Sequence, residues 1–446
     1  MDRQRERSGA EGRRVPARFA AWAALGAALL LAPASRADRV VILDTDREAI
    51  EARVELMLQA QREVRASYFI IGDDPFSLTS LSLLRDAARR GLTVRLLVDA
   101  QWNKIPPALV GHLESEGIEI REYHPFRLDK LGWIFRRMHD KLLIGDDRDL
   151  VAGGRNIEST YFGFGRQIKQ RNYIDCDLRV QGQAATEARD YFDRLWASGE
   201  VRPVVSGATP AERLAAGRKL APHKAWLDRQ VEEARHDPER AREDPVEVGP
   251  VRFLHDPVGP KGSARGVSHE LLSLLDQARE SALIESPYLI PSHAFRRGLK
   301  HALARGVRVR ILTNSLGSTD NLLAQAGYVG KKARLVKSGV EIWEYQGPEC
   351  LHAKAAVIDG ETGIVGSFNL DPRSEFLNTE IALSFKDRAL AGQLAAILDS
   401  HLANSVRIDA RGWPEGATGP FPGIPRLKVV KLRLLQLLAP FIERQL

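Results

Sequence analysis

The chain carries one eight-residue pattern twice, and the two copies lie 213 positions apart. The first copy, HDKLLIGD, runs from His139 to Asp146, and the second, HAKAAVID, runs from His352 to Asp359. Both have the form H-x-K-x4-D, and each is followed by a turn of small residues that ends in asparagine. One match to so short a pattern carries little weight. Two copies predict two half-sites that are built alike and act as a pair.

The duplication extends to the sequence around the motifs. Residues 90–97 (RGLTVRLL) align with residues 305–312 (RGVRVRIL), and residues 117–123 (GIEIREY) align with residues 339–345 (GVEIWEY). Each half reads as helices that alternate with strands, which predicts an α/β fold with helices covering a mostly buried sheet. We expect the two halves to pack about a pseudo-twofold axis, so that the two motifs face each other.

The residue types in the motif suit chemistry on a phosphodiester. His and Lys stand two residues apart before an apolar run that reads as a strand, so both side chains point to one face. One neutral histidine can attack phosphorus, and the other, protonated, can donate to the leaving alkoxide. Lys141 and Lys354 can stabilise the charge on the phosphoryl oxygens. Asp146 and Asp359 complete the catalytic motif, although their places at strand ends favour a role in the turn.

We expect no metal and no other cofactor. The sequence lacks the HExxH and C-x2-C spacings of metal sites, and lysine and asparagine can supply the charge stabilisation that a metal would give.

A nucleophilic histidine needs a partner at its second ring nitrogen that holds it in one tautomer. Asp177 and Glu380 each stand at the start of an apolar strand downstream of a motif. We expect Asp177 to orient His139 and Glu380 to orient His352, with Asp175 competing for the first of these roles.

The paired motif resembles that of the phospholipase D superfamily. The runs Gly153–Ile157, Gly366–Ser374 and Asn378–Glu380 are similar to those of the bacterial cardiolipin synthases of the C type. The resemblance implies two α/β sandwich domains with mixed sheets. It also implies transfer of a phosphatidyl group, from phosphatidylglycerol or alternatively phosphatidylethanolamine, to phosphatidylglycerol through a phosphohistidine.

The resemblance also implies roles for individual residues. It favours His139 as the nucleophile and gives phosphate-binding roles to Asn156, Ser367 and Asn369. Gly154 stands where the second half has Ser367, so the two half-sites are not equivalent.

Other functions are weighed against this one. A phospholipase D hydrolase would use the same residues with water as the acceptor, and the sequence does not separate it from a transferase. The net charge is +7, but residues 1–37 hold seven arginines and three acids, so little excess positive charge remains elsewhere. This balance disfavours a nuclease and a nucleic-acid partner. Intact His and Lys in both motifs disfavour a non-catalytic lipid-binding homologue.

The regions outside the two domains predict a location at a membrane. Residues 1–37 combine arginines, a 16-residue apolar run and the small-x-small tripeptide 35–37, as in a signal peptide or, if uncleaved, an N-terminal anchor. We therefore expect export to the cell envelope, at the periplasmic face of the inner membrane of a Gram-negative-like bacterium.

The remaining boundaries follow from composition. We expect a first domain at residues 38–205, a charged helical connector at 206–248, a second domain at 249–410, and a linker with a basic amphipathic tail at 411–446. Such a tail binds either the membrane interface or its own domain.

Cys176 and Cys350 are either a disulfide or two free thiols.

Overall fold

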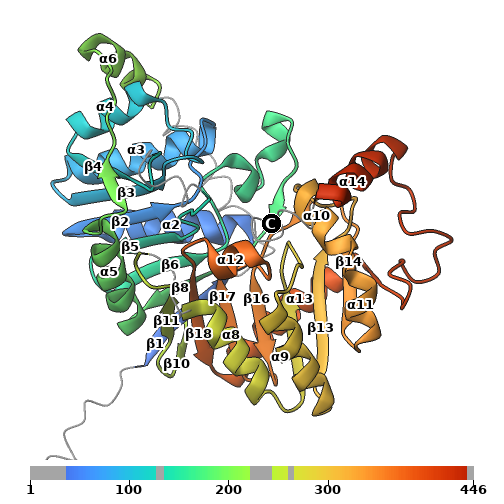
Figure 1. Ribbon diagram of the computed structural model, residues 1–446. Helices are drawn as coiled ribbons and strands as arrows, with labels where there is room; N and C mark the ends of the chain where they lie inside the picture. The colour runs from blue at the N-terminus through green and yellow to red at the C-terminus, as the bar shows by residue number, and fades with distance from the viewer. Residues whose placement is uncertain (1–36, 127–134, 221–243, 260–265, 439–446) are drawn as a thin grey trace, which may run out of the picture. The chain divides into compact units, whose positions relative to one another are not determined.

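The computed structural model describes residues 37–126, 135–220, 244–259 and 266–438 (Figure 1). These residues belong to one compact unit, residues 37–446. The predicted signal segment, apart from Ala37, and the larger part of the predicted connector lie outside the described residues. Within the described residues, no helix combines the length and the apolar character needed to cross a membrane.

The first half is built on a nine-stranded sheet with the order β10-β1-β8-β6-β5-β2-β3-β4-β9. Its strands are β1 (Asp38–Leu43), β2 (Glu63–Tyr68), β3 (Thr93–Asp99), β4 (Ile118–Tyr123), β5 (Lys141–Gly145), β6 (Asp149–Gly153), β8 (Asp177–Gln181), β9 (Val201–Pro203) and β10 (Val246–Val248). The helices are α2 (Asp46–Gln59), α3 (Pro75–Arg89), α4 (Pro107–Ser115), α5 (Gln183–Trp196) and α6 (Pro210–Arg218), with the short turns η2 (Ser159–Phe162) and η3 (Gly165–Ile168).

The second half repeats this plan on an eight-stranded sheet, with the order β11-β18-β17-β16-β12-β13-β14-β19. Its strands are β11 (Arg252–His255), β12 (Ser281–Glu285), β13 (Arg308–Asn314), β14 (Glu341–Tyr345), β16 (Ala355–Ile358), β17 (Thr362–Gly366), β18 (Ile381–Lys386) and β19 (Ser405–Arg407). The helices are α8 (Gly266–Gln277), α9 (His293–Ala304), α10 (Leu322–Val329), α11 (Lys332–Lys337), α12 (Pro372–Phe376), α13 (Arg388–Leu402) and α14 (Arg426–Leu438).

The strand directions confirm the predicted mixed sheets. In the first half β2, β3 and β4 are parallel, whereas β5, β6, β8 and β1 continue the sheet antiparallel. In the second half β12, β13 and β14 are parallel, and β16, β17 and β18 are antiparallel to their neighbours. β10 falls within the predicted connector, yet it pairs with β1, so the end of that segment completes the first sheet.

Capping residues fix the two ends of helix α3. The carboxylate of Asp74 accepts from the backbone N–H of Ser77, and Pro75 occupies the first helical turn. Gly91 follows the helix at φ +91°, a conformation that glycine adopts without strain. Gly91 therefore marks the end of this helix, and the Asp74 cap marks its start.

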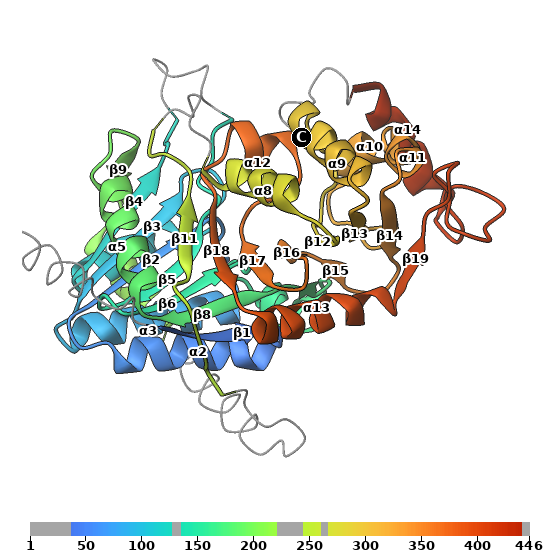
Figure 2. The same ribbon diagram turned by 90° about the horizontal axis from the view of Figure 1, so that it is seen from below.

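A shared apolar core joins the two halves, which lie side by side (Figures 1 and 2). Strands β6 and β8 of the first sheet contact β17 of the second, and β6 also contacts β18. Buried residues of α5 and α13 belong to the same core. Separate cores lie under α2 and α3 in the first half and under α8 and α9 in the second. A short parallel pair, β7 (Tyr173–Ile174) with β15 (Cys350–Leu351), also links the halves.

The two motif aspartates hold turns, which corrects their inclusion among the catalytic residues. Asp146 and Asp359 have φ of +54° and +52°, and each follows the strand that its motif opens. The carboxylate of Asp359 accepts from the backbone N–H groups of residues 279–281, and that of Asp146 from those of residues 61–63. Each lies seven residues from its histidine along an extended chain, which spans roughly 20 Å.

We predict that Asp359→Ala lowers the free energy of unfolding by about 1–3 kcal/mol, because three backbone donors lose their acceptor. Those donors hold the folded-state pKa of Asp359 below its ordinary 3.8, against a burial effect that would raise it. The contribution is therefore complete above pH 3.8 and is lost as the pH falls through the lower folded-state value. Urea unfolding at neutral and acidic pH measures this difference. Asp359→Asn, which keeps an oxygen acceptor and tolerates positive φ, serves as the matched control and should lose less.

Candidate active site

The backbone of each motif histidine is held by the opposite half of the molecule. The N–H of His139 donates to the carbonyl of Thr379 at 3.1 Å, and the N–H of His352 donates to the carbonyl of Ile174 at 2.7 Å. His139 lies two residues before Lys141, which opens β5, and His352 lies two residues before Lys354, which immediately precedes β16. Both histidines are buried. The reciprocal contacts place the two motifs at the junction between the halves.

Glu380 orients His139, which corrects its predicted pairing with His352. Its Oε2 lies 3.0 Å from Nδ1 of His139. The same oxygen accepts a short hydrogen bond from the hydroxyl of Ser367, while Oε1 accepts from Nδ2 of Asn378 at 3.2 Å. Burial would raise the pKa of Glu380, but His139, Lys141 and Ser367 overcome it and lower the pKa to about 2. Glu380 is thus a carboxylate that holds the Nδ1–H tautomer of His139.

Asp175 orients His352, so the predicted role of Asp177 is wrong. Its Oδ2 lies 2.6 Å from Nδ1 of His352. Burial would raise the pKa of Asp175, but Lys354 and His352 hold it well below its usual range. Asp177 instead accepts from Arg53 Nη2 at 2.8 Å and from the backbone N–H of Arg155 at 3.2 Å. Both partners lie in the first half, so Asp177 stabilises the packing within that half.

Strand register explains why Asp175, rather than Asp177, corresponds to Glu380. Gly153 pairs with Asp177 across β6 and β8, and Gly366 pairs with Ala382 across β17 and β18. Gly153 and Gly366 occupy the same place in the two repeats, so the residues two positions before their partners also correspond. Those residues are Asp175 and Glu380. Each therefore reaches across the junction to the histidine of the other half.

The two lysines lie beside their histidines in fully buried positions. Nζ of Lys354 lies 2.7 Å from Nδ1 and 3.1 Å from Nε2 of His352, and Nζ of Lys141 donates to the carbonyl of His139 at 2.5 Å. Burial lowers the pKa of Lys141 to about 7, aided by Lys354 and opposed by Glu380. Burial also lowers the pKa of Lys354. The charge of Lys354 in the second half thus lowers the pKa of Lys141 in the first half, so the two lysines belong to one charged cluster.

Both histidines have lowered pKa values. Burial lowers the pKa of His139 to about 4, with Glu380 opposing and Lys141 and Lys354 adding to the shift. Burial also lowers the pKa of His352, followed by the charge of Lys354, with Asp175 opposing. His139 is therefore neutral at neutral pH. With Nδ1–H directed at Glu380, its Nε2 carries a free lone pair.

The three predicted phosphate-binding residues have different surroundings. Asn156 accepts from the N–H of Ile70 and donates to the hydroxyl of Tyr161, so both ends of its amide are engaged. Ser367 supports Glu380. The Oδ1 of Asn369 is buried and has no hydrogen-bond partner among the described residues. Asn369 is therefore the member of this group with an unused buried polar atom.

The difference between Gly154 and Ser367 has a steric cause. A Cβ atom on Gly154 would meet Oδ1 of Asp175 at 1.9 Å, far inside van der Waals contact. The first half therefore needs glycine beside its carboxylate. The second half instead uses a serine that donates to its own carboxylate, Glu380.

Aromatic residues that the sequence analysis did not select surround the histidines. The ring of Phe69 lies 4.9 Å from that of His139 and 5.6 Å from that of Trp102. Tyr161 and Tyr173 each lie 5.1 Å from the ring of His352. Phe69, Trp102 and Tyr161 stand in turns, and Tyr173 stands in the two-residue strand β7, so apolar periodicity gives no signal for any of them.

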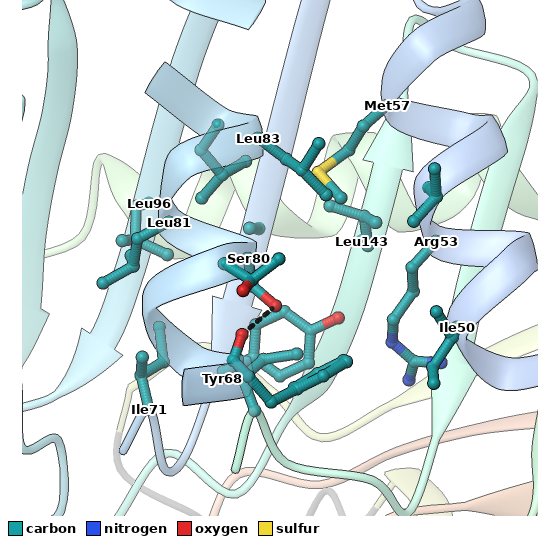
Figure 3. Close-up of a pocket in the computed structure, with 16 residues that line it drawn as sticks. Ile50, Arg53, Met57, Tyr68, Ile71, Ser80, Leu81, Leu83, Leu96 and Leu143 are labelled. Atoms are coloured by element: carbon teal, nitrogen blue, oxygen red, sulfur yellow. Dashed lines mark hydrogen bonds between the residues drawn. The ribbon is translucent and has the colours of Figure 1, made fainter. Parts of the chain in front are cut away.

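Each half contains one apolar cavity between its helices and its sheet. A cavity with about 520 Å³ of empty space lies between α2, α3 and the first sheet, and neither motif's histidine nor lysine lines it (Figure 3). A cavity with about 610 Å³ of empty space lies between α8, α9 and the second sheet, with Lys354 among its lining residues.

Cys176 and Cys350 are buried free thiols. Burial raises the pKa of both, so neither is poised as a nucleophile. The described residues contain no group of three or more His, Cys, Asp or Glu side chains placed to hold a metal ion.

Comparisons with known proteins identify the family. The family described as "Cardiolipin synthase, PLD-like domain" matches residues 54–196 and 271–402, one segment in each half. Cardiolipin synthase C of Escherichia coli (strain K12) is 30% identical over 389 residues, which cover 78% of this chain and 81% of that protein. Cardiolipin synthase B of Salmonella typhi is 29% identical over 377 residues, covering 83% and 82% respectively. The chain belongs to the cardiolipin synthase family of phospholipase D-like enzymes.

A solved structure supports the fold of this cardiolipin synthase family member. Phosphatidylserine synthase of Haemophilus influenzae Rd KW20 superposes with a TM-score of 0.64 and covers 91% of this chain and 95% of its own. The identity is 16%, so this likeness concerns the fold alone. The predicted resemblance and the predicted repeat are both confirmed.

We predict that Glu380→Gln lowers kcat by roughly 10²- to 10⁴-fold with little change in unfolding midpoint, because a neutral amide no longer holds the Nδ1–H tautomer of His139. The measurement is phosphatidyl transfer in detergent micelles, with kcat and KM determined separately.

Glu344→Gln is the matched control. Glu344 is also a buried glutamate of the second half, but it accepts from Lys332 at 2.8 Å and Tyr328 at 2.9 Å. The control should lose stability and keep its kcat. An equal loss of kcat in both variants would contradict the orienting role of Glu380.

Proposed function

We propose that this protein is a phosphatidyltransferase that makes cardiolipin, with a phospholipid as donor and phosphatidylglycerol as acceptor. The observation that carries the proposal is the pair of crossed acid–histidine contacts, Glu380 with His139 and Asp175 with His352. They supply two oriented imidazoles within one charged cluster. A transfer by double displacement at phosphorus needs this arrangement, because one imidazole bonds to phosphorus while the other moves protons.

In the first step, Nε2 of neutral His139 attacks the phosphorus of the donor lipid. The Nε2–P bond forms, and the P–O bond to the donor's head-group alcohol breaks. His352 gives its proton to the departing alkoxide. The anionic phosphodiester raises the pKa of His352 by adding negative charge beside it, which offsets the effect of Lys354 and equips His352 as the acid.

In the second step, His352 takes the proton from the terminal hydroxyl of phosphatidylglycerol. The hydroxyl oxygen bonds to phosphorus, the N–P bond breaks, and His139 returns to its neutral form. Lys141 and Lys354 stabilise the extra charge on the phosphoryl oxygens in both steps. Asn369 would contact the substrate through its amide, and the support is its buried Oδ1, which has no partner among the described residues.

We further propose that the protein works in the cell envelope, at the periplasmic face of the inner membrane. The support is the sequence of residues 1–37, with its arginines, its apolar run and its small-x-small end. Protease added to spheroplasts should therefore digest the protein without detergent, while a cytoplasmic marker survives. Protection of the protein until detergent is added would contradict this location.

We predict that the chain restores cardiolipin to bacterial cells that lack it, as measured by lipid mass spectrometry. His139→Ala and His352→Ala should each reduce the product by at least about 10³-fold, because each removes one of two required roles. The transfer should continue in detergent micelles that contain a chelator, because lysines supply the charge stabilisation.

Two further measurements separate the alternatives. The ratio of cardiolipin to phosphatidic acid distinguishes transfer from hydrolysis, and a product that is mainly phosphatidic acid would favour a phospholipase D. Mass spectrometry of the unaltered protein, quenched with acid-free denaturant during turnover of the donor lipid, should find the phosphatidyl group on His139. A phosphatidyl group on His352 and none on His139 would contradict the proposed nucleophile.

A further inference from the structure

Helix α14 packs on the second half through one face. Its sequence from Arg426 to Leu438 is RLKVVKLRLLQLL, and Leu432 is fully buried in the core of that half. Val429 and Leu435 are partly buried against the same core. The helix lies against α10 (Figure 1). This contact agrees with the docked alternative that the sequence left open for the tail.

The opposite face of α14 is also apolar, and it is exposed. Five large side chains on it are between 53% and 69% exposed: Leu427, Val430, Leu434, Leu437 and Leu438. At about 100° per residue, the centre of this stripe lies about 190° around the helix from the docked face. A helix that only packed on its own domain would place polar residues there.

Basic residues border the exposed stripe on both sides. At about 100° per residue, Arg426 and Arg433 fall along one edge and Lys431 falls along the other. The sequence from 426 to 438 contains no acidic residue. An apolar stripe between two basic edges is the pattern of a helix that lies in the interface of an anionic bilayer.

The helix lies on the His352 side of the site. Lys428 lies near Arg171 and Cys350, and burial lowers its pKa, with the positive charge of Arg171 adding to the shift. Cys350 precedes His352 by two residues. Helix α10, on which α14 packs, begins two residues after Asp320. Asp320 accepts from the hydroxyl of Tyr173, a ring neighbour of His352.

A second exposed apolar group lies on the His139 side. Trp102 is 43% exposed and stacks near Phe69, the ring neighbour of His139. Phe126 and Phe135 are 67% and 47% exposed. Trp102 and Phe126 each follow the carboxyl end of a parallel strand, β3 or β4, by three residues. Of the eleven large apolar side chains that the described residues leave exposed, eight belong to this group or to α14.

We propose that the exposed face of α14 binds the surface of an anionic phospholipid bilayer and, with Trp102, Phe126 and Phe135, holds the mouth of the active site against the lipid. The proposal rests on the proposed function, because the substrates of a phosphatidyltransferase lie in the bilayer. Leucines insert among the acyl chains, and Arg426, Lys431 and Arg433 lie at the level of the phosphates. Lipid then reaches the paired histidines without leaving the membrane surface.

Charge favours a lipid surface over a second copy of this chain. Two copies of the same face would bring the basic edges of both helices together and repel each other. An anionic bilayer presents the opposite charge along both edges. Each basic residue near such a surface adds on the order of 1 kcal/mol at low salt, which corresponds to roughly a fivefold gain in binding.

The test is flotation with vesicles of phosphatidylcholine and phosphatidylglycerol, using Leu434→Glu with Leu437→Glu in one variant. Binding should fall at least about tenfold, since two inserted leucines are replaced by charges. The matched control is Leu58→Glu with Leu214→Glu, at leucines that are 59% and 61% exposed on α2 and α6. The full chain and residues 37–446, which form one compact unit, are both compared so that the apolar N-terminal sequence does not mask the effect.

A third variant, Arg426→Gln with Lys431→Gln, should lose binding to phosphatidylglycerol vesicles and keep its weak binding to pure phosphatidylcholine. Turnover of vesicle substrate by the leucine variant should fall with binding, while turnover of a short-chain phosphatidylglycerol dissolved as monomers stays unchanged. If the leucine variant still turns over the monomeric substrate, this also shows that the variant is folded.

Binding is measured without turnover, so a chain that made no cardiolipin would refute the proposed function and leave this test intact. Equal flotation of the leucine variant and the original chain would overturn the proposal. So would an equal loss in the Leu58/Leu214 control. Loss of a lipid-free dimer in the leucine variant, with flotation unchanged, would assign the face to a second copy instead.

Discussion

The crossed contact between each carboxylate and the histidine of the opposite half is the interaction on which the site depends. Glu380 lies 3.0 Å from His139, and Asp175 lies 2.6 Å from His352. Neither half alone contains an oriented histidine, because the acid that fixes the tautomer comes from across the junction. The shared apolar core formed by α5, α13 and the adjoining strands therefore serves catalysis, since it sets the distance between each acid and its histidine.

The same junction buries an unusual concentration of charge. His139, Lys141, His352 and Lys354 are all at most 7% exposed, and so are Asp175 and Glu380. Burying ionised groups is costly unless they are paired. The carboxylates have lowered pKa values and stay ionised, whereas the pKa of Lys141 falls to about 7 and that of His139 to about 4. The cluster resists further positive charge, and an anionic phosphodiester would relieve that repulsion. The charged cluster is therefore most stable when a phosphate group is bound.

Exposed apolar side chains and the paired histidines lie at the same end of the strands. His139 and His352 stand where β5 and β16 begin, beside the carboxyl ends of the parallel strands β2–β4 and β12–β14. Trp102 and Phe126 follow two of those ends, and α14 packs on the helix that follows a third. Substrates that are confined to a bilayer would need the reactive groups close to the surface that we propose to bind the membrane. This topology brings the exposed apolar side chains and the reactive groups to the same end of the strands.

The sequence by itself determined the repeat and the pairing of histidine with lysine. The period of a strand brings residues two apart to one face, and duplication makes that face occur twice, so the two His–Lys pairs could be read directly. Only the tertiary structure decided which acid serves which histidine, what Asp146 and Asp359 hold, and how α14 can dock and still expose leucines. These outcomes depend on strand register and on contacts between segments that are far apart in the sequence, and such contacts leave no local pattern that records them.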